Sequence, residues 1–201
     1  MQPGLFSNSS ENLLPFDGET RYYGKFLYKS EADIFFEKLK SQIKWRQEPI
    51  LLFGKSIMQP RLTALYGNTE KPFGYSGIIM QPFEWTELLL EIKNRVEEKA
   101  KTDFTHVLLN YYRDGKDSMG WHRDNEAILG QKPTIASVSF GEIREFQIRH
   151  YREKKFKLKF PLDHGSLLIM SGNSQHHWEH QVPKTSKTLG PRINLTFRKI
   201  Q

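Results

Sequence analysis

The stretch Arg192-Ile-Asn-Leu-Thr-Phe-Arg198 has the clearest strand pattern in this chain. Polar residues stand at its even positions and apolar residues at its odd positions. Because side chains alternate between the two faces of a strand, this pattern predicts a strand with one polar and one apolar face. Such a strand fits a β-sandwich in which the apolar face packs on the core and the polar face lines an internal pocket. A basic edge strand facing water would give the same pattern.

Five further segments in the second half of the chain also have the composition of strands. They are short, rich in β-branched or aromatic residues, and bounded by Gly, Pro, Asn or Asp, which predicts strands. These segments are residues 106–112, 134–140, 145–150, 156–160 and 166–170. Between Lys155 and Lys159 the Lys residues alternate with Phe and Leu, which predicts a half-buried strand with a basic outer face.

The first half of the chain contains two helical patterns. Ser30 followed by Asp33 indicates the start of the first helix. Its buried stripe would be Ile34, Phe35, Leu39 and Ile43. The second helix is predicted from about Thr86 to Lys101, and its core-facing residues would be Leu89, Ile92 and Val96.

Residues 45–81, between the two helices, are interpreted as strands and loops. Their aromatic residues are interleaved with Gly and basic residues, which suits a surface that stacks on bases and contacts phosphates. An aromatic-rich hairpin packed on the core would have the same composition.

The order of these elements predicts the architecture. Helices followed by many short strands indicate an α+β, mainly β fold, a β-sandwich or jelly roll with helices packed on one sheet. We expect one domain, with residues 1–20 as a loosely ordered lead-in, the helices within 21–102 and a strand-rich core over 103–201.

Composition restricts the classes of function. The 201 residues include no cysteine, which excludes disulfides, thiolate zinc sites and cysteine nucleophiles. A net charge of +7 suits a polyanionic partner such as nucleic acid, although many basic proteins bind nothing acidic. The charge is concentrated, with seven Lys/Arg against two Glu in residues 143–160 and five against none in 181–201.

Hydropathy bears on the compartment. No apolar run approaches the roughly 20 residues that a membrane helix needs, so no membrane partner is expected. Met1 to Leu14 is polar and lacks the basic start and apolar stretch of a signal peptide. We expect an intracellular protein, cytoplasmic if bacterial and nuclear if eukaryotic.

His122 and Asp124 form a His-x-Asp pair. On a strand, residues two apart point to the same side, so both side chains could reach one ion. A third ligand could come from the cluster of His176, His177 and His180. Two His and one carboxylate on one face of an octahedral metal suit non-haem Fe(II), because three positions stay open. A surface pair on a turn would also produce His-x-Asp.

Arg192 and Arg198 lie downstream of these candidate ligands. An arginine on the polar face of this strand can hold a dicarboxylate through a bidentate pair. The combination of candidate ligands and arginines therefore favours a metal site with an acidic cosubstrate.

Taken together, these residues resemble the AlkB family of Fe(II)/2-oxoglutarate-dependent dioxygenases, from about Phe53 to Ile200. The blocks that carry the resemblance are Leu109-Asn-Tyr-Tyr-Arg-Asp-Gly, Gly120-Trp-His-Arg-Asp-Asn-Glu126, Ile135-Ala-Ser-Val-Ser-Phe-Gly141, His164-Gly-Ser-Leu-Leu-Ile-Met170 and Pro191-Arg-Ile-Asn-Leu-Thr-Phe-Arg-Lys199. The chain looks closest to the AlkB homologue 2 branch, whose vertebrate members repair alkylated bases in double-stranded DNA. The resemblance implies a double-stranded β-helix, the jelly roll, with a nucleotide-recognition lid before it, here within 21–102.

The resemblance also implies roles for the site residues. His122, Asp124 and His180 would be the catalytic ligands of Fe(II). Arg192 would bind the distal carboxylate of 2-oxoglutarate, in a pocket completed by Asn110, Tyr112, Thr196 and Arg198. The pocket wall would include Trp178, His176 and His177. The default interpretation of these three residues is that they pack in the core or behind the ligands.

Substrate-binding residues follow from the same resemblance. Phe53, Gly54 and Lys55 match the hairpin that probes the duplex and fills the gap left by a flipped base. Phe73, Gly74 and Tyr75 match the lid over that base, which Tyr75 and the His122 ring could sandwich. Arg61 and the loop 184–187 would contact phosphates. Asn125 stands where close relatives carry Asp, and Glu126 keeps a carboxylate beside it.

The activity that the resemblance implies is DNA repair by oxidative demethylation of bases of the 1-methyladenine and 3-methylcytosine type. The reaction would use Fe(II) as its cofactor and consume 2-oxoglutarate and O₂. It would release formaldehyde, succinate and CO₂. The expected partner is alkylated DNA, double-stranded or single-stranded, or RNA, and the expected state is a monomer.

Three alternatives stay open at this point. A dioxygenase of the same fold could act on RNA, protein or lipid. A catalytically silent module could recognise damaged DNA, although it would not need the full ligand set. A zinc hydrolase would leave Arg192 and Arg198 unexplained.

Overall fold

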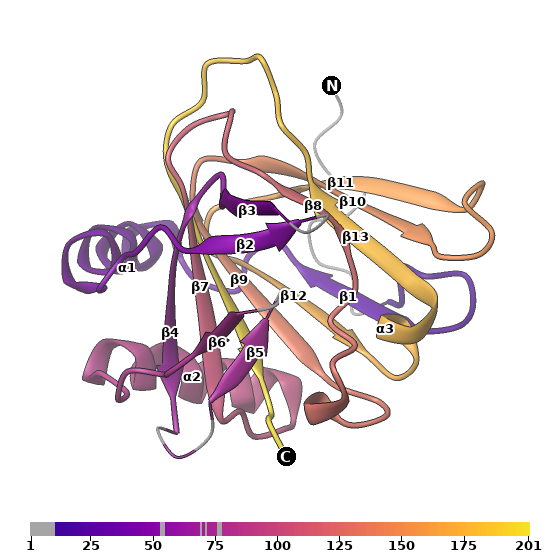
Figure 1. Ribbon diagram of the computed structural model, residues 1–201, viewed down its shortest axis with the longest axis horizontal. Helices are drawn as coiled ribbons and strands as arrows, with labels where there is room; N and C mark the ends of the chain where they lie inside the picture. The colour runs from indigo at the N-terminus through magenta and orange to yellow at the C-terminus, as the bar shows by residue number, and fades with distance from the viewer. Residues whose placement is uncertain (1–10, 53–54, 69, 71, 76–77) are drawn as a thin grey trace.

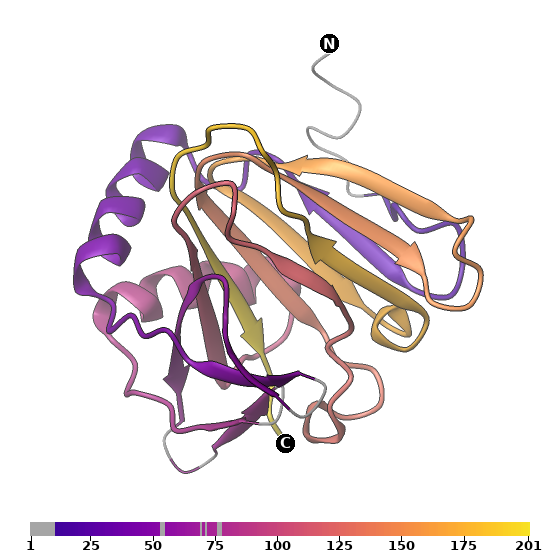
Figure 2. The same ribbon diagram turned by 45° about the horizontal axis from the view of Figure 1, so that its top comes forward.

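Two antiparallel sheets stacked face to face form the body of the molecule (Figures 1 and 2). The computed structural model describes residues 11–52, 55–68, 70, 72–75 and 78–201. The larger sheet contains, in order, β1 (Glu19–Tyr23), β12 (Ser166–Ser171), β9 (Ile135–Gly141), β14 (Arg192–Arg198), β7 (His106–Tyr112) and β4 (Leu62–Gly67). The smaller sheet contains β11 (Lys157–Leu162), β10 (Arg144–His150), β13 (Trp178–Val182) and β8 (Met119–His122).

The chain crosses repeatedly between the two sheets from β7 to β14, and this is the topology of the predicted jelly roll. All six predicted strands are confirmed, with ends that differ by up to two residues. The sequence does not predict β13, because Trp178–Val182 lacks the alternation of polar and apolar residues that marks a half-buried strand. The described residues between 45 and 81 form strands and loops as expected. They include β2 (Pro49–Leu52) paired with β3 (Lys55–Met58), and β5 (Phe73–Tyr75) paired with β6 (Ile78–Met80).

Two apolar layers result from the alternation of side chains. Ile193, Leu195 and Phe197 of β14 pack in a core between the larger sheet and the helices. A second core lies between the two sheets and includes Phe146 and Trp178. The polar face of β14 therefore points between the sheets, which settles the choice between an internal pocket and a basic edge strand.

Helices α1 (Lys29–Gln42) and α2 (Glu87–Ala100) cover the outer face of the larger sheet (Figure 1). In α2 the prediction is confirmed, because Thr86 caps the helix by accepting a hydrogen bond from the backbone N–H of Leu89. None of the helices in the described part of the chain has the length and apolar character to cross a membrane.

Two predictions for α1 are wrong. The helix begins at Lys29 without a side-chain cap, one residue before Ser30. Ile34 is 55% exposed, whereas Ala32, Phe35 and Leu39 form the buried stripe. Ile34 lies about 100° around the helix from Phe35, on the side away from Ala32 and Leu39, so it faces solvent.

Residues 11–20 are ordered, which corrects the expectation of a loose lead-in for this part. The Asn12 side chain accepts hydrogen bonds from the backbone N–H groups of Leu14 and Thr20. Leu14 is buried, and the Phe16 ring packs at 5.8 Å from the ring of Trp178. These contacts fix the start of β1 against β12.

Gly141, at the end of β9, is the position where a side chain would disturb the fold most directly. Its φ is +83°, and a Cβ atom would collide with the carbonyl oxygen of Pro191 and lie 2.7 Å from the Phe36 ring. We expect Gly141→Ala to lower the free energy of unfolding by about 2 kcal/mol or more, measured by urea denaturation. Gly120→Ala is the control, because a Cβ there meets nothing within 4 Å. Equal stability of the two variants would contradict this packing.

Candidate metal and cosubstrate site

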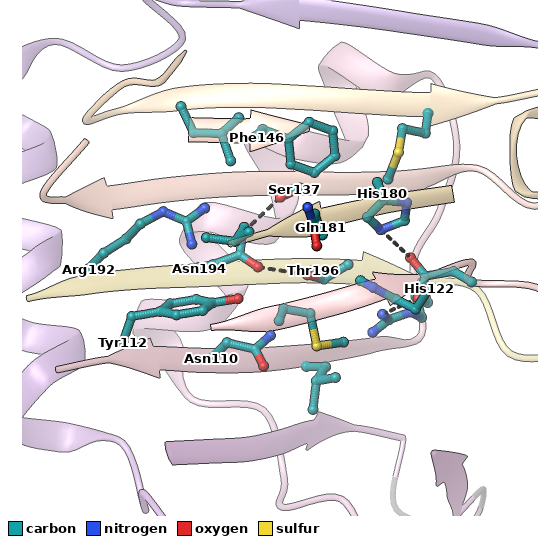
Figure 3. A pocket seen from close by; sticks show the side chains of 17 residues that line it. Asn110, Tyr112, His122, Ser137, Phe146, His180, Gln181, Arg192, Asn194 and Thr196 are labelled. Carbon is teal, nitrogen blue, oxygen red and sulfur yellow. Dashed lines mark hydrogen bonds and ion pairs between the residues drawn. The ribbon is translucent and has the colours of Figure 1, made fainter. Parts of the chain in front are cut away.

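The three candidate ligands His122, Asp124 and His180 come together between the sheets. Figure 3 shows the two histidines at one end of the pocket. Their ligand atoms all lie within 4.8 Å of one another. Nε2 of His180 is 3.8 Å from Oδ2 of Asp124, and the two imidazole rings are 4.2 Å apart between centroids. Two imidazoles and one carboxylate converging in this way form the donor set that suits non-haem Fe(II).

Hydrogen bonds prepare these side chains for a metal. Nδ1 of His122 lies 2.8 Å from the carbonyl oxygen of Gly120. A carbonyl can only accept, so Nδ1 carries the proton and the Nε2 lone pair is left for an ion. Oδ1 of Asp124 accepts a hydrogen bond of 2.6 Å from Nη2 of Arg198.

The electrostatics agree with this preparation. Burial lowers the pKa of His180 to about 3 and also lowers the pKa of His122. Burial alone would raise the pKa of Asp124, but Arg198 and the two histidines lower it far below its usual range. At neutral pH the cluster therefore has two neutral imidazoles and one carboxylate, the protonation states that bind a metal.

The other end of the same pocket is built around Arg192 (Figure 3). Arg192 is 1% exposed, and burial lowers the pKa of its guanidinium. Nη2 donates to Oγ of Ser139 at 2.9 Å, while Nε and Nη1 have no hydrogen-bond partner in the described part of the chain. A buried cation in this state calls for an anion, and a carboxylate can take two of its donors.

Between the two ends, β14 provides a polar wall. Asn194 donates from Nδ2 to Oγ of Ser137 at 2.7 Å, and Thr196 donates to Oδ1 of Asn194 at 3.0 Å. The sequence-predicted residues Asn110, Tyr112, Thr196 and Arg198 all line this pocket together with the three candidate ligands. The residues present thus fit both Fe(II) and a dicarboxylate.

A second group of potential ligands is formed by Asp17, His150 and His177. Nδ1 of His150 accepts a hydrogen bond of 2.9 Å from the backbone N–H of Glu153, so Nε2 carries the proton in the neutral ring. Nε2 is the atom that faces Asp17, at 3.5 Å, and it has no lone pair to offer. We therefore assign no metal to this group.

The histidines and tryptophan before His180 do not form pocket wall. Trp178 is 1% exposed in the core between the sheets, His177 faces Asp17, and His176 contacts the carbonyl of Gln131. The default interpretation, packing outside the pocket, describes them better.

Arg61 differs from its prediction. It is 3% exposed, and its Nε donates to Oδ1 of Asn110 at 2.6 Å. Its place on the approach to β4 points it inward, so the expected phosphate contact is wrong. In the structure Arg61 orients a pocket residue instead.

The remaining substrate candidates lie partly outside the described residues. Phe53 and Gly54 fall outside them altogether. Lys55 belongs to β3, and Phe73, Gly74 and Tyr75 form β5, but of these only Gly74 is described beyond its backbone, with open space at its Cα. Asn125 is exposed beside Asp124. Oε2 of Glu126 is buried without a hydrogen bond in the described part of the chain, and burial raises the pKa of this carboxyl.

Sequence reasoning missed three side chains that organise the site. Ser137 and Ser139 bind the polar face of β14, and their alternation inside an apolar strand was a usable signal. Gln175 accepts a hydrogen bond from the backbone N–H of Asp124 at 2.9 Å. Nothing in the sequence marks that contact, because the two residues are 51 positions apart.

Comparisons with known proteins agree with this geometry. The family described as the 2OG-Fe(II) oxygenase superfamily matches residues 19–198. Alpha-ketoglutarate-dependent dioxygenase alkB homolog 3 of Bos taurus is 44% identical over 187 residues, which cover 87% of this chain and 64% of that protein. DNA oxidative demethylase ALKBH2 of Homo sapiens is 38% identical over 183 residues, covering 86% and 70%.

The chain thus spans somewhat less than two thirds of the alkB homolog 3 protein, which has the higher identity of these two relatives. Among solved structures, OsALKBH1 has a TM-score of 0.61 at 18% identity, covering 90% of this chain and 97% of that one, which shows a shared fold. Family match, relatives and geometry together place the chain in the 2OG-Fe(II) oxygenase superfamily, among the AlkB homologues.

Proposed function

We propose that this chain is an Fe(II)- and 2-oxoglutarate-dependent dioxygenase that demethylates alkylated bases in DNA, with 1-methyladenine and 3-methylcytosine as substrates. The observation that carries the proposal is the single pocket that has three ligand side chains at one end and the buried, unpaired donors of Arg192 at the other. A relative named DNA oxidative demethylase supports the choice of substrate.

Each residue has a role in this proposal. His122, Asp124 and His180 hold Fe(II), and Arg192 binds the distal carboxylate of 2-oxoglutarate. Asn110 and Tyr112 line the pocket as hydrogen-bonding groups, and Arg61 keeps the Asn110 amide in place. When bound, iron, 2-oxoglutarate and O₂ supply the oxidation that turns the N-methyl group into formaldehyde, with succinate and CO₂ as coproducts.

The protein has to hold a cationic base close to these groups. Glu126 follows Asp124 by two residues, and its buried Oε2 has no partner within the described residues. A carboxylate in that position would attract the positive charge of 1-methyladenine or 3-methylcytosine. Because such lesions pair poorly, they cost less to flip out of a helix than normal bases.

A basic groove on the outer face of the smaller sheet supports a nucleic-acid partner. Lys154, Lys157 and Lys159 line it together with Trp121, whose ring lies 3.9 Å from the Arg149 guanidinium. Trp121 directly precedes the candidate ligand His122, so the groove adjoins the strand that carries the metal site. Cations along such a groove would contact phosphates and make binding sensitive to salt.

We expect the double variant Lys157→Ala/Lys159→Ala to weaken DNA binding and to reduce the slope of log affinity against log salt by roughly one to two. Fluorescence anisotropy with a labelled duplex over a salt series measures both quantities. The control is Lys38→Ala/Lys40→Ala, which removes the same charge from α1 on the outer side of the larger sheet. Identical slopes for the two double variants would exclude this face from DNA binding.

The form of the nucleic acid is tested with one lesion in three settings. Oligonucleotides carrying a single 1-methyladenine are supplied as duplex DNA, single-stranded DNA and RNA, and demethylation and succinate are measured together. We propose duplex DNA as the preferred form and a monomer as the active state. If RNA were demethylated faster than either form of DNA, RNA would be the substrate. Succinate without demethylation would point to another class of substrate.

A catalytically silent reader of damaged DNA is the alternative from another class. It would bind methylated oligonucleotides without producing succinate. The arrangement of three ligands and Arg192 in one pocket argues against it, because recognition alone needs neither.

A further inference from the structure

We infer that Gln175 is a positioning residue that fixes Asp124 for metal binding by holding its backbone. The inference rests on the proposed metal site. It concerns a side chain outside the pocket, which contacts neither the ion nor the substrate.

Asp124 lies where the sheet no longer supports the chain. β8 ends at His122, and the last pair in its ladder with β13 at this end joins His122 to His180. Residues 123–126 belong to no regular element. A ligand in such a segment has no neighbouring strand to fix its backbone, so its position depends on other contacts.

Gln175 provides the missing contact. Its Oε1 accepts the backbone N–H of Asp124 at 2.9 Å, which is the only hydrogen bond recorded for that N–H among the described residues. Both residues are 1% exposed, so water cannot substitute freely for this bond. The other end of the amide, Nε2, lies 3.5 Å from the thioether sulfur of Met170, a weak acceptor. The oxygen must therefore face Asp124.

Gln175 is itself firmly held. It belongs to the one-turn helix α3 (Ser174–His177), which directly precedes β13. Oγ of Ser174 lies 2.6 Å from the carbonyl oxygen of Ser171 and accepts the backbone N–H of Glu19 at 2.9 Å. The helix is thereby bound to both β12 and β1. Because Gln175 belongs to this helix, its side chain holds the backbone of Asp124 in a fixed position.

The position of Asp124 decides where its free oxygen points. Oδ1 is taken by Arg198, and Oδ2 faces Nε2 of His180 at 3.8 Å. If the backbone N–H lost its acceptor, the segment 123–126 would shift and carry Oδ2 with it. Because metal sites tolerate only small displacements of their ligands, affinity should fall although all three ligands remain.

The test compares two Gln→Met substitutions in the full chain. Gln175→Met keeps the volume and removes the acceptor. Gln59→Met is the matched control, because Gln59 is also fully buried and its amide has no hydrogen-bond partner among the described residues. Gln175→Glu is the rescue variant, since it keeps an acceptor oxygen. The readouts are the dissociation constant of Fe(II), measured anaerobically by titration calorimetry, and the visible absorption of Co(II) bound in its place.

We expect Gln175→Met to weaken Fe(II) binding by roughly 10- to 100-fold and to change the Co(II) spectrum. Gln59→Met should leave both unchanged, and Gln175→Glu should recover most of the affinity. Unchanged affinity in Gln175→Met, or an equal loss in both Met variants, would overturn the inference. If wild-type protein bound no metal, the proposed function itself would fail.

Discussion

Arg192→Met is expected to raise the melting temperature of the metal-free protein while weakening 2-oxoglutarate binding by roughly 100-fold or more. The two effects have one cause. Arg192 is a buried cation that forms no ion pair among the described residues, and its Nε and Nη1 have no hydrogen-bond partner there. Replacing a buried charge that has no counter-ion by an apolar side chain of similar length stabilises the fold, whereas losing one partner of a buried pair costs about 3–5 kcal/mol.

The control for this prediction is Arg144→Met. Arg144 is also buried, but its guanidinium donates to three backbone carbonyls, those of Asp114, Asp117 and Pro183 at 3.1, 2.9 and 2.7 Å. Its removal leaves these carbonyls without donors, so the melting temperature should fall. Thermal denaturation gives the stability, and succinate formation against 2-oxoglutarate concentration gives the KM. If both variants lost stability alike, Arg192 would be a structural arginine rather than a binding group.

The second large effect is expected for His180→Ala. The variant should lose at least about 100-fold in Fe(II) affinity and should lose turnover with it. This loss is larger than the one expected for Gln175→Met, because His180 binds the metal directly. Burial keeps His180 neutral by lowering its pKa to about 3, so the ring is ready to bind a metal at any pH near neutrality. Titration calorimetry without oxygen measures the affinity, and release of succinate measures the turnover.

His150→Ala serves as the matched control. His150 is also buried, lies on the neighbouring strand β10 and belongs to the second group of potential ligands. Its tautomer excludes metal binding, so Fe(II) affinity should stay at the wild-type value. A loss of affinity in this variant, with His180→Ala still binding iron, would move the metal site to the Asp17 group.

Alternation along β14 was enough to predict the core of this fold. A strand that is polar on one face and apolar on the other needs an apolar layer on one side and a polar pocket on the other. β14 has both, because the helices cover Ile193 and Leu195 and the pocket is lined by Arg192 and Thr196. The ligand pair was predictable from its spacing, because two residues that are only two positions apart cannot lie far from each other, as with His122 and Asp124.

Other features depend on contacts that local sequence does not encode. The inward orientation of Arg61 depends on Asn110, which is 49 residues away, and the backbone of Asp124 depends on Gln175. The order of residues 11–20 depends on Phe16 packing against Trp178. Ile34 was misplaced because an apolar residue beside a helical stripe looks like part of it until the sheet below is known.

Oxidative demethylation at this site is tested by the mass of a duplex oligonucleotide carrying one 1-methyladenine, before and after incubation with the protein, Fe(II), 2-oxoglutarate and ascorbate in air. We predict that wild-type protein removes one CH₂ unit and forms succinate, and that His122→Ala does neither. An unchanged mass and no succinate, from protein that is folded and has bound iron, would contradict the assignment of this site to oxidative demethylation.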